Sequence, residues 1–536
     1  MSAPDLKPAP AARPAGFGTE RPSMRELLAA LEADRAAMRD EARPAAVARQ
    51  RDRAEHTARE RIAMLVDPGS FREFGELARE AGEPAGEKPG DGVVAGAAKV
   101  EGRPVNVVAQ DFTVMGGSSG EIGSRKMQQA LRRSVREGAP LALLLDGGGH
   151  RIQIGQNSRR YAPSTGLFQD LARLSGWAPM CAAMLGAGFA APTNFSGLAD
   201  LVTMVRGQSF MGLAGPALVK AGTGEDIDAQ TLGGAEAQVD RNGIADLGCA
   251  DEAEAIGALR RFLGYLPTNA GQPAPVREAP PEDPARDEAL LDLVPSNTRR
   301  AYDMRKVVNL IADPDSVFEL KPTYARNVLT SFARIRGRPV GIVANQPMSM
   351  GGMLTGPACD KAARFVSMCD AFGLPLVYLI DVPGFSIGSA AEKGQLGRRS
   401  AKLIQELGHA TVPRVSVVLR KGYGLGYVAM AGGRSFEADA AYAWPTAEIC
   451  AMSIEGAVQV VNARKLAAAE DPDAMRAGLI AAMRAEVTPF GGAEGFGLDD
   501  IIDPRKTRAC IAETLERAPA RRDIGMPPKF RAITPI

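Results

Sequence analysis

Four glycine turns in this chain place bare backbone where a ligand could approach it. They are Met115-Gly116-Gly117, Asp146-Gly147-Gly148-Gly149, Met350-Gly351-Gly352 and Asp381-Val382-Pro383-Gly384. Glycine permits close approach and backbone dihedral angles that other residues avoid. One isolated turn of this kind is usually only a tight connection between a strand and a helix. Four turns in two matching sets favour a binding site instead.

A second pattern places unpaired amide groups at two expected helix starts. The apolar runs that end at Met184 and Val418 are each followed by small residues and then by an expected helix start. The first N–H groups of a helix have no partner within it and carry partial positive charge. Two neighbouring amides there can hold a developing oxyanion, such as an enolate. None of these segments is a phosphate loop or a dinucleotide fingerprint.

The matching sets belong to two copies of one sequence pattern. Gly102-Arg103-Pro104-Val105 and Gly337-Arg338-Pro339-Val340 lie 235 positions apart, and the same offset relates Lys126 to Lys361. The offset persists without an insertion as far as the second glycine turn of each set. We therefore predict two copies of one fold, and we expect the chemistry at the seam between them.

Length, composition and charge limit the class of protein. A chain of 536 residues is too long for a single hydrophobic core, so two domains of about 200–250 residues are expected. The composition is that of an ordinary soluble protein, and a net charge of +1 gives no reason to expect nucleic acid or an anionic membrane as partner. The sequence shows neither an apolar span nor a signal core, which predicts a cytoplasmic protein.

Cysteine and histidine are too sparse for the commonest metal and triad chemistry. The six cysteines form no CxxC pair, which argues against a zinc site, and we predict no metal. The chain has only three histidines, His56, His150 and His409. A histidine-based triad would need most of them, so we expect a mechanism that does not depend on histidine.

Alternating elements predict an α/β fold. The short apolar runs at 141–146 and 376–381 read as buried strands, and 127–137 and 362–372 read as helices. Strands that alternate with helices indicate crossover connections and a mostly parallel sheet. Ligands of such sheets bind at the carboxyl ends of the strands, where the glycine turns fall.

The chain divides into four segments on composition. Residues 1–23 are rich in Pro and Ala and are predicted to be disordered, and 24–267 form the first domain. Within that domain 25–65 reads as one long charged helix. The polar, proline-rich stretch 268–298 is predicted to be a linker, and 299–536 the second domain.

Several of these segments resemble one known family, the biotin-dependent acyl-CoA carboxyltransferase β subunits of the propionyl-, acetyl- and methylcrotonyl-CoA carboxylase kind. The resemblance covers roughly residues 25–525 and is most specific in the second copy. The matching stretches are Ala109-Gln110-Asp111-Phe112-Thr113-Val114-Met115-Gly116-Gly117, Lys361-Ala362-Ala363-Arg364-Phe365-Val366, Leu379-Ile380-Asp381-Val382-Pro383-Gly384-Phe385, Arg420-Lys421-Gly422-Tyr423-Gly424 and Tyr442-Ala443-Trp444-Pro445-Thr446-Ala447-Glu448-Ile449.

The resemblance implies a fold, partners and an assembly. Each half is expected to be a crotonase-like ββα superhelix, the first binding acyl-CoA and the second the carboxybiotin arm of a separate carrier protein. The active site is expected between the first half of one subunit and the second half of its dimer partner, in a hexamer built from such dimers. The chain has no AMKM-like biotinylation site, so the carrier and the biotin carboxylase are expected on other polypeptides.

The resemblance also implies the reaction. Carboxybiotin would supply both CO₂ and the base, so the protein needs mainly positioned amides. The carboxyl group would go to the α- or vinylogous carbon of a short acyl-CoA, with propionyl-CoA the preferred expectation. Two alternatives stay open: a biotin-dependent acyl-CoA decarboxylase subunit, and a non-enzymatic assembly paralogue whose site has decayed.

Motif matching assigns the amide donors to Leu425 and Gly426 in the second half. In the first half they are either Ala190 and Ala191, or Ala191 and the next position, where Pro192 has no N–H. We predict the first alternative. The other residues expected to bind substrate are Gly116, Gly117, Gly148, Gly149, Lys126, Gly351, Gly352, Pro383, Gly384, Phe385, Tyr423 and Val428.

Three residues depart from the family pattern in the first half. They are Gly147 in place of serine, His150 in place of alanine and Gln238 in place of a frequent histidine. These changes surround the expected acyl-CoA side and leave the identity of the acyl group open.

Overall fold

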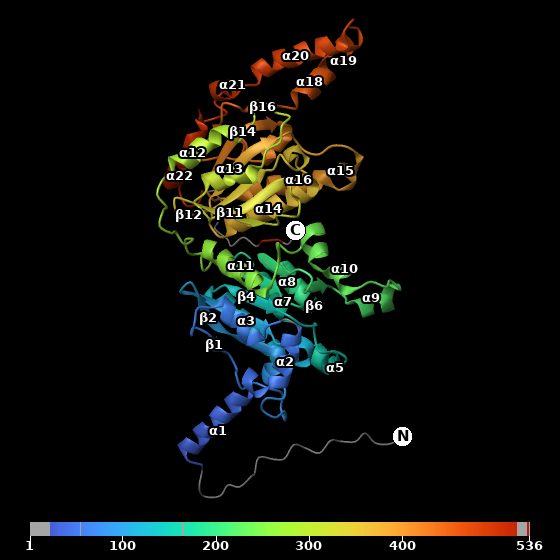
Figure 1. The fold of residues 1–536 in the computed structure, drawn as a ribbon, viewed down its shortest axis with the longest axis vertical. Coiled ribbons are helices and arrows are strands. Elements are labelled where there is room, and N and C mark those ends of the chain that lie inside the picture. The colour runs from blue at the N-terminus through green and yellow to red at the C-terminus, as the bar shows by residue number, and fades with distance from the viewer. Residues whose placement is uncertain (1–21, 54, 163–165, 523–532, 535–536) are drawn as a thin grey trace.

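Two sheets, one from each half of the chain, form the body of the protein (Figure 1). The computed structural model describes residues 22–53, 55–162, 166–522 and 533–534. All but the last two residues of the segment predicted to be disordered, 1–23, lie outside this description. The domain limits inferred from composition stay predictions.

The first sheet contains seven strands, of which the first three are antiparallel and the rest join in parallel. In spatial order they are β1 (Arg72–Glu73), β2 (Val93–Val100), β3 (Arg103–Gln110), β4 (Leu141–Leu145), β5 (Met180–Met184), β7 (Leu201–Val205) and β9 (Leu247–Cys249). A separate parallel pair is formed by β6 (Ala187–Phe189) and β8 (Phe210–Gly212).

The second sheet repeats this order and these directions, which confirms the duplication and the mostly parallel sheet. Its path is β10 (Phe318–Leu320), β11 (Val328–Ile335), β12 (Arg338–Asn345), β13 (Leu376–Val382), β14 (Arg414–Tyr423), β15 (Ala440–Ala443) and β17 (Asp500–Ile501). The short strand β16 (Glu448–Cys450) pairs with the end of β14.

Helices cover both faces of each sheet. Those of the first half are α1 (Met24–Ala37), α2 (Pro44–Asp52), α3 (Ala58–Leu65), α4 (Glu121–Glu137), α5 (Ile152–Gly155), α6 (Ser158–Tyr161), α7 (Leu167–Leu174), α8 (Ala191–Leu198), α9 (Pro216–Thr223), α10 (Ala229–Gly233) and α11 (Glu252–Tyr265). The rest are α12 (Pro284–Glu288), α13 (Met304–Ile311), α14 (Gly356–Ala371), α15 (Ser389–Lys393), α16 (Leu396–His409), α17 (Gly424–Ala429), α18 (Ile454–Val461), α19 (Ala463–Ala467), α20 (Pro472–Glu486), α21 (Pro489–Glu494) and α22 (Thr507–Arg517).

The strand β4 shows why its sequence is apolar throughout. Ala142 and Leu144 face the core that α3 and α11 share with the second half, while Leu143 and Leu145 face the core under α4 and α7. Side chains alternate between the two faces of a strand, so a strand covered on both faces must be apolar at every position.

The prediction of one long helix over 25–65 is wrong. The segment forms three helices, because Pro44 begins α2 and Thr57 caps α3 in a capping box with Glu60. Proline has no N–H and cannot continue a preceding helix, and the threonine side chain satisfies an amide at the new helix start.

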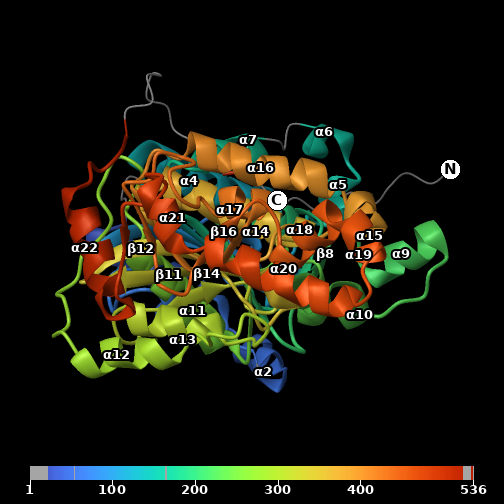
Figure 2. The same cartoon turned by 90° about the horizontal axis from the view of Figure 1, so that it is seen from above.

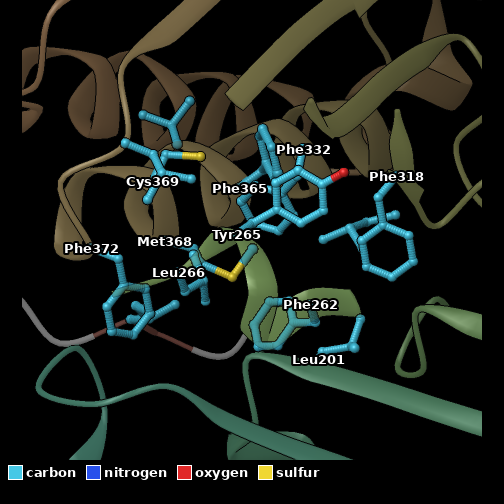
Figure 3. Close-up of a cluster of buried hydrophobic side chains, with 14 of the residues drawn as sticks. Leu201, Phe262, Tyr265, Leu266, Phe318, Phe332, Phe365, Met368, Cys369 and Phe372 are labelled. Carbon is cyan, nitrogen blue, oxygen red and sulfur yellow. The ribbon is translucent and has the colours of Figure 1, made fainter. Parts of the chain in front are cut away.

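The seam between the two copies in one chain is a buried aromatic core. Tyr265 at the end of α11 stacks on Phe332 of β11 with ring centroids 5.7 Å apart, and Phe332 contacts Phe365 at 5.1 Å (Figure 3). Phe332 is fully buried. The expectation that chemistry occurs at this seam is therefore wrong for the seam within one chain, since aromatic rings fill it.

Polar contacts between the two halves also stabilise the same seam. Lys321 of the second half pairs with Asp246 of the first at 3.2 Å. Arg364 on α14 donates to the backbone carbonyl groups of Ala199 and Asp200. These contacts hold the two halves in one fixed relation.

We predict that Phe332→Ala lowers the free energy of unfolding by about 3–5 kcal/mol, because it removes a buried ring on which three other aromatic residues converge. Chemical denaturation measures the change. Phe490→Ala is the control, since the ring of Phe490 is 58% exposed, and it should shift stability by no more than about 0.5 kcal/mol. Equal stability of Phe332→Ala and the native chain would show that the seam is not a core.

Candidate active site

A duplicated side-chain amide connects the glycine turns to the neighbouring strand ends. Asn345 at the end of β12 accepts from the backbone N–H of Asp381 at 3.2 Å and donates to the carbonyl of Gly352 at 3.1 Å. Gln110 makes the same two contacts in the first half, with Asp146 and Gly117. Each half thus fixes its two glycine turns against each other.

The strand-end carboxylate of each half is buried and held by an arginine. In the second half Arg420, in β14, donates to Asp381 at 3.0 Å and also to the carbonyl groups of Asn297 and Arg300. A charge buried without a partner would cost several kcal/mol, so this pair fixes the end of β13 where the Pro383-Gly384 turn begins.

The first half reaches the same result with a different arginine. Arg61 of α3 donates to Asp146 at 2.7 Å, and its other branch meets Glu252 of α11 at 2.5 Å. Burial, reinforced by the charge of Asp146, raises the pKa of nearby Glu55 to about 7. Asp381 is therefore held by an arginine of the neighbouring strand β14, whereas the equivalent Asp146 is held by an arginine of the helix α3.

Gly117 and Gly352 lie in crowded parts of the turns, and their role in substrate binding stays a prediction. A Cβ atom on Gly117 would lie 2.1 Å from the carbonyl oxygen of Asp146, and one on Gly352 would lie 2.7 Å from that of Asp381. Gly116 and Gly351 meet nothing within 4 Å and have positive φ angles of 62° and 63°. Only these latter two leave open space beside the backbone.

In the second half the predicted donors lie in the first turn of α17. A Cβ atom on Gly426 would lie 2.8 Å from the Cα atom of Gly384, so the two glycine segments touch backbone to backbone. No described residue outside the helix accepts from the amides of Leu425 and Gly426. Amides at this position carry partial positive charge, which suits them to an oxyanion.

Tyr423 is the residue that precedes the first turn of α17, and its side chain makes no capping hydrogen bond to that turn. Its hydroxyl donates to Glu448, whose other oxygen accepts from Arg484 of α20 at 3.2 Å. Burial and the charge of Glu448 raise the pKa of Tyr423, so the hydroxyl stays protonated and remains a donor. Tyr423 therefore positions the turn through a hydrogen bond of its own.

In the first half the predicted pair Ala190 and Ala191 is wrong in its first member. Ala190 donates its N–H to the carbonyl of Gly212 at 2.9 Å, so this amide is already used. Ala191 begins α8, and no described residue accepts from its amide. The Cβ position of Gly149 lies 3.6 Å from the nitrogen of Ala191, which places the glycine loop beside that amide.

The strand register identifies the equivalent positions of the two helix starts. Leu141 pairs with Met180 in the first sheet, and Leu376 pairs with Arg414 in the second. Since Leu141 and Leu376 lie 235 positions apart, Met180 and Arg414 are equivalent at an offset of 234. The second copy therefore has one residue fewer than the first between these two strands.

At that offset Ala190 corresponds to Gly424, and both have positive φ angles, 62° and 59°. Ala191 then corresponds to Leu425 and Pro192 to Gly426. Proline has no N–H, so the first half retains one of the two helix-start amides that the second half has. This geometry favours the second of the two alternatives, in which the donor positions are Ala191 and Pro192 and only Ala191 has an N–H.

The prediction that Lys126 binds substrate is also wrong. Its side chain is 5% exposed and pairs with Glu73 at 3.1 Å, on the inner face of α4. Burial lowers the pKa of Lys126. Arg125 points outward beside it and pairs with Glu121.

Other predicted residues lie near the two helix starts. Val428 is half-buried in α17, and Pro383 and Phe385 flank Gly384 in the loop that precedes α15. Gly148 meets nothing within 4 Å of its Cβ position. The roles of these residues stay predictions.

His150 lies in the same loop as Gly148 and Gly149. Its ring packs edge-on against Tyr161 of α6, with centroids 5.7 Å apart, and its Nε2 atom is buried with no partner among the described residues. Gly149 directs its Cβ position toward Ala191. The His150 ring therefore belongs to the loop that lies beside the Ala191 amide, where it packs against Tyr161.

Sequence reasoning missed the residues that hold the turns in place. Gln110 and Asn345 occupy repeat-equivalent positions, so a polar residue at the end of both buried strands was a readable signal. Arg420 was a second signal, because a charge ends an otherwise apolar run. The partners Arg61 and Glu252 had no such signal.

The comparisons with known proteins agree with this geometry. The family model described as the carboxyl transferase domain matches residues 49–533. The chain is 41% identical over 481 residues to the methylmalonyl-CoA carboxyltransferase 12S subunit of Propionibacterium freudenreichii subsp. shermanii, which covers 89% of this chain and 91% of the relative. It is 38% identical to the propionyl-CoA carboxylase beta chain of Roseobacter denitrificans, over 91% of this chain and 96% of the relative.

A solved structure gives the same result. The crystal structure of transcarboxylase 12S, a hexamer with methylmalonyl-coenzyme A and methylmalonic acid bound, superposes with a TM-score of 0.88 at 39% identity, covering 96% of this chain and 99% of that one. Two crotonase-like superhelix units are thereby confirmed. The chain belongs to the carboxyl transferase domain family. It falls within the biotin-dependent acyl-CoA carboxyltransferases, as the resemblance predicted.

Two further properties concern the described residues alone. They contain no group of three or more His, Cys, Asp or Glu side chains arranged to hold a metal ion. In the same part of the chain no helix combines the length and the apolar character needed to cross a membrane.

We predict that Gly426→Ala lowers kcat for carboxyl transfer by about 100-fold, because the added Cβ would overlap Gly384 and displace the helix-start amides. Steady-state kinetics measures this change, and denaturation confirms that the variant is folded. Gly408→Ala in α16, where nothing lies within 4 Å, is the control and should keep full activity. A folded Gly426→Ala variant with native kcat would show that these amides do not contribute to catalysis.

Proposed function

We propose that this chain transfers a carboxyl group from biotin, carried on a separate protein, to the α-carbon of a short acyl-CoA thioester. The observation that carries the proposal is the duplicated helix start, with unpaired amides of α17 against Gly384 and the amide of Ala191 against Gly149. Carboxyl transfer through a thioester enolate needs hydrogen-bond donors at a developing oxyanion more than it needs side-chain acids or bases.

The first half is proposed to bind the thioester. The amide of Ala191 would donate to its carbonyl oxygen, which gains negative charge as the α-proton leaves. Gly148 and Gly149 have no side chains to obstruct the acyl group there. The Arg61–Asp146 pair keeps this loop in place while the charge develops.

The second half is proposed to bind the biotin ring. Leu425 and Gly426 would donate to its ureido oxygen, and Gly384 leaves room for the ring against bare backbone. When bound, carboxybiotin supplies both the CO₂ and the base, and this explains a site without a histidine dyad. Gly384 has a φ of 125° and open space at its Cβ position, so the turn fits a ligand that approaches the backbone.

The assembly and partners extend this proposal. The aromatic core within one chain leaves no room for the reaction between its own halves. We therefore propose that the first half of one subunit faces the second half of a partner, in a hexamer such as that of transcarboxylase 12S. The carrier protein and the biotin carboxylase are proposed to be separate subunits.

The reverse direction is the second candidate. The chain is 37% identical, over 90% of its length, to the methylmalonyl-CoA decarboxylase subunit alpha of Veillonella parvula. The same amides would stabilise the same enolate whether the carboxyl group arrives or leaves. Direction therefore depends on the partners that supply or remove carboxybiotin.

The test combines the purified chain with its cognate biotin carboxylase and carrier, ATP, radiolabelled bicarbonate and a panel of acyl-CoA thioesters. We expect label in an acid-stable product, with propionyl-CoA the best acceptor and discrimination per methylene of about 10- to 200-fold. Transfer of carboxylate from methylmalonyl-CoA to the carrier, with no labelled product from bicarbonate and ATP, would favour the decarboxylase. No transfer in either direction with any thioester would refute the function.

A further inference from the structure

A basic groove lies on the second half, next to the proposed biotin site. It has a volume of about 610 Å³ and is bounded by α15 and α16. Four cations line it, Lys393, Arg398, Arg399 and Lys402, against one carboxylate, Asp360. The chain as a whole has a net charge of only +1, so this excess of positive charge is a local feature.

Two of the four cations are already used within the fold. Arg399 donates to Asp360 of α14, and Lys402 lies 3.9 Å from the same carboxylate. The side chain of Asp360 is only 8% exposed. This buried carboxylate therefore anchors α16 on α14 and neutralises part of the charge, but not all of it.

The other two cations, Lys393 and Arg398, are free to meet a partner. Both are exposed, and neither has a hydrogen bond or ion pair with any of the residues that the structure describes. The helix α16 begins at Leu396, and the preceding Gln395 makes no side-chain capping hydrogen bond. The unpaired amides of its first turn therefore add partial positive charge to the same rim. The groove thus presents uncompensated positive charge to solvent.

The position of the groove indicates which ligand it serves. The loop that carries Gly384 and Phe385 leads directly into α15, and α16 packs against α17, whose first turn holds Leu425 and Gly426 (Figure 2). A macromolecule docked on the groove would therefore lie beside the proposed biotin amides. Ile387, between that loop and α15, is 91% exposed and lies on the same approach.

We propose that this groove is the docking surface for an acidic face of the biotin carrier protein, with Lys393 and Arg398 as the main contacts. The inference rests on the proposed function, which requires a carrier to deliver biotin to this half. Opposite charges at the rim of an interface act mainly by steering the encounter, and salt screens them over about 8–10 Å. The charges would then guide the carrier to the face from which its biotin can reach the amides.

The test compares a protein-bound biotin with a small one. The double variant Lys393→Ala and Arg398→Ala is measured for its Kd toward the biotinylated carrier domain, by fluorescence anisotropy at low and at high salt. Carboxyl transfer is measured in parallel with the carrier and with free biotin. Lys306→Ala in α13 is the control, because Lys306 is exposed and lies outside the groove.

We expect the double variant to raise the carrier Kd and KM about tenfold at low salt, with kcat and the reaction of free biotin unchanged. The difference from the native chain should shrink at high salt. An unchanged Kd would overturn the proposal. So would a raised KM for acyl-CoA with free biotin, which would show that the groove holds CoA phosphates. Absence of turnover by the native chain would refute the proposed function alone, since binding of the carrier is measured separately.

Discussion

The site depends on backbone N–H groups that have no hydrogen-bond partner inside their own helix. Such amides exist at every helix start, and water or a capping side chain normally satisfies them. At α17 no side chain caps the start, and glycine at 426 lets the helix start pack directly against the backbone of Gly384. The amides are therefore available to a ligand, and the rest of the structure serves to hold them in place.

The fold meets this requirement in layers. Buried apolar strands fix the sheet, the side-chain amides of Gln110 and Asn345 connect the glycine turns to the strand ends, and Arg61 and Arg420 fix the strand-end carboxylates. Catalysis by fixed dipoles works because the donors need no reorganisation as charge develops. The duplication supplies two such arrays, which a reaction between two bound molecules can use.

Much of this could be predicted from the sequence, because it follows from local patterns. The repeat offset, the apolar strands and the glycine turns are visible in the chain, and the motif match to Leu425 and Gly426 led to the first turn of α17. The failures concern contacts between distant segments. The N–H of Ala190 bonds to the carbonyl of Gly212, and the side chain of Lys126 pairs with Glu73. No sequence pattern predicts either partner.

The seam was misjudged for a similar physical reason. The apolar pattern of a helix such as α11 is the same whether the helix covers only its own sheet or also packs against the second copy. The structure shows that Phe262 and Tyr265 also reach Phe332 of the second copy. The one-residue change in the repeat offset is equally invisible until the strands are paired, and it decides that Pro192 rather than Ala191 is equivalent to Gly426.

The most direct measurement of the central claim restores the missing amide hydrogen. Pro192→Ala adds one N–H at the position equivalent to Gly426 and removes only the pyrrolidine ring. If helix-start amides stabilise the enolate, kcat at saturating acyl-CoA and carrier should rise, by up to about 100-fold. A folded variant whose kcat is unchanged or lower would contradict the account, because an added donor at that position would then have no effect on the reaction.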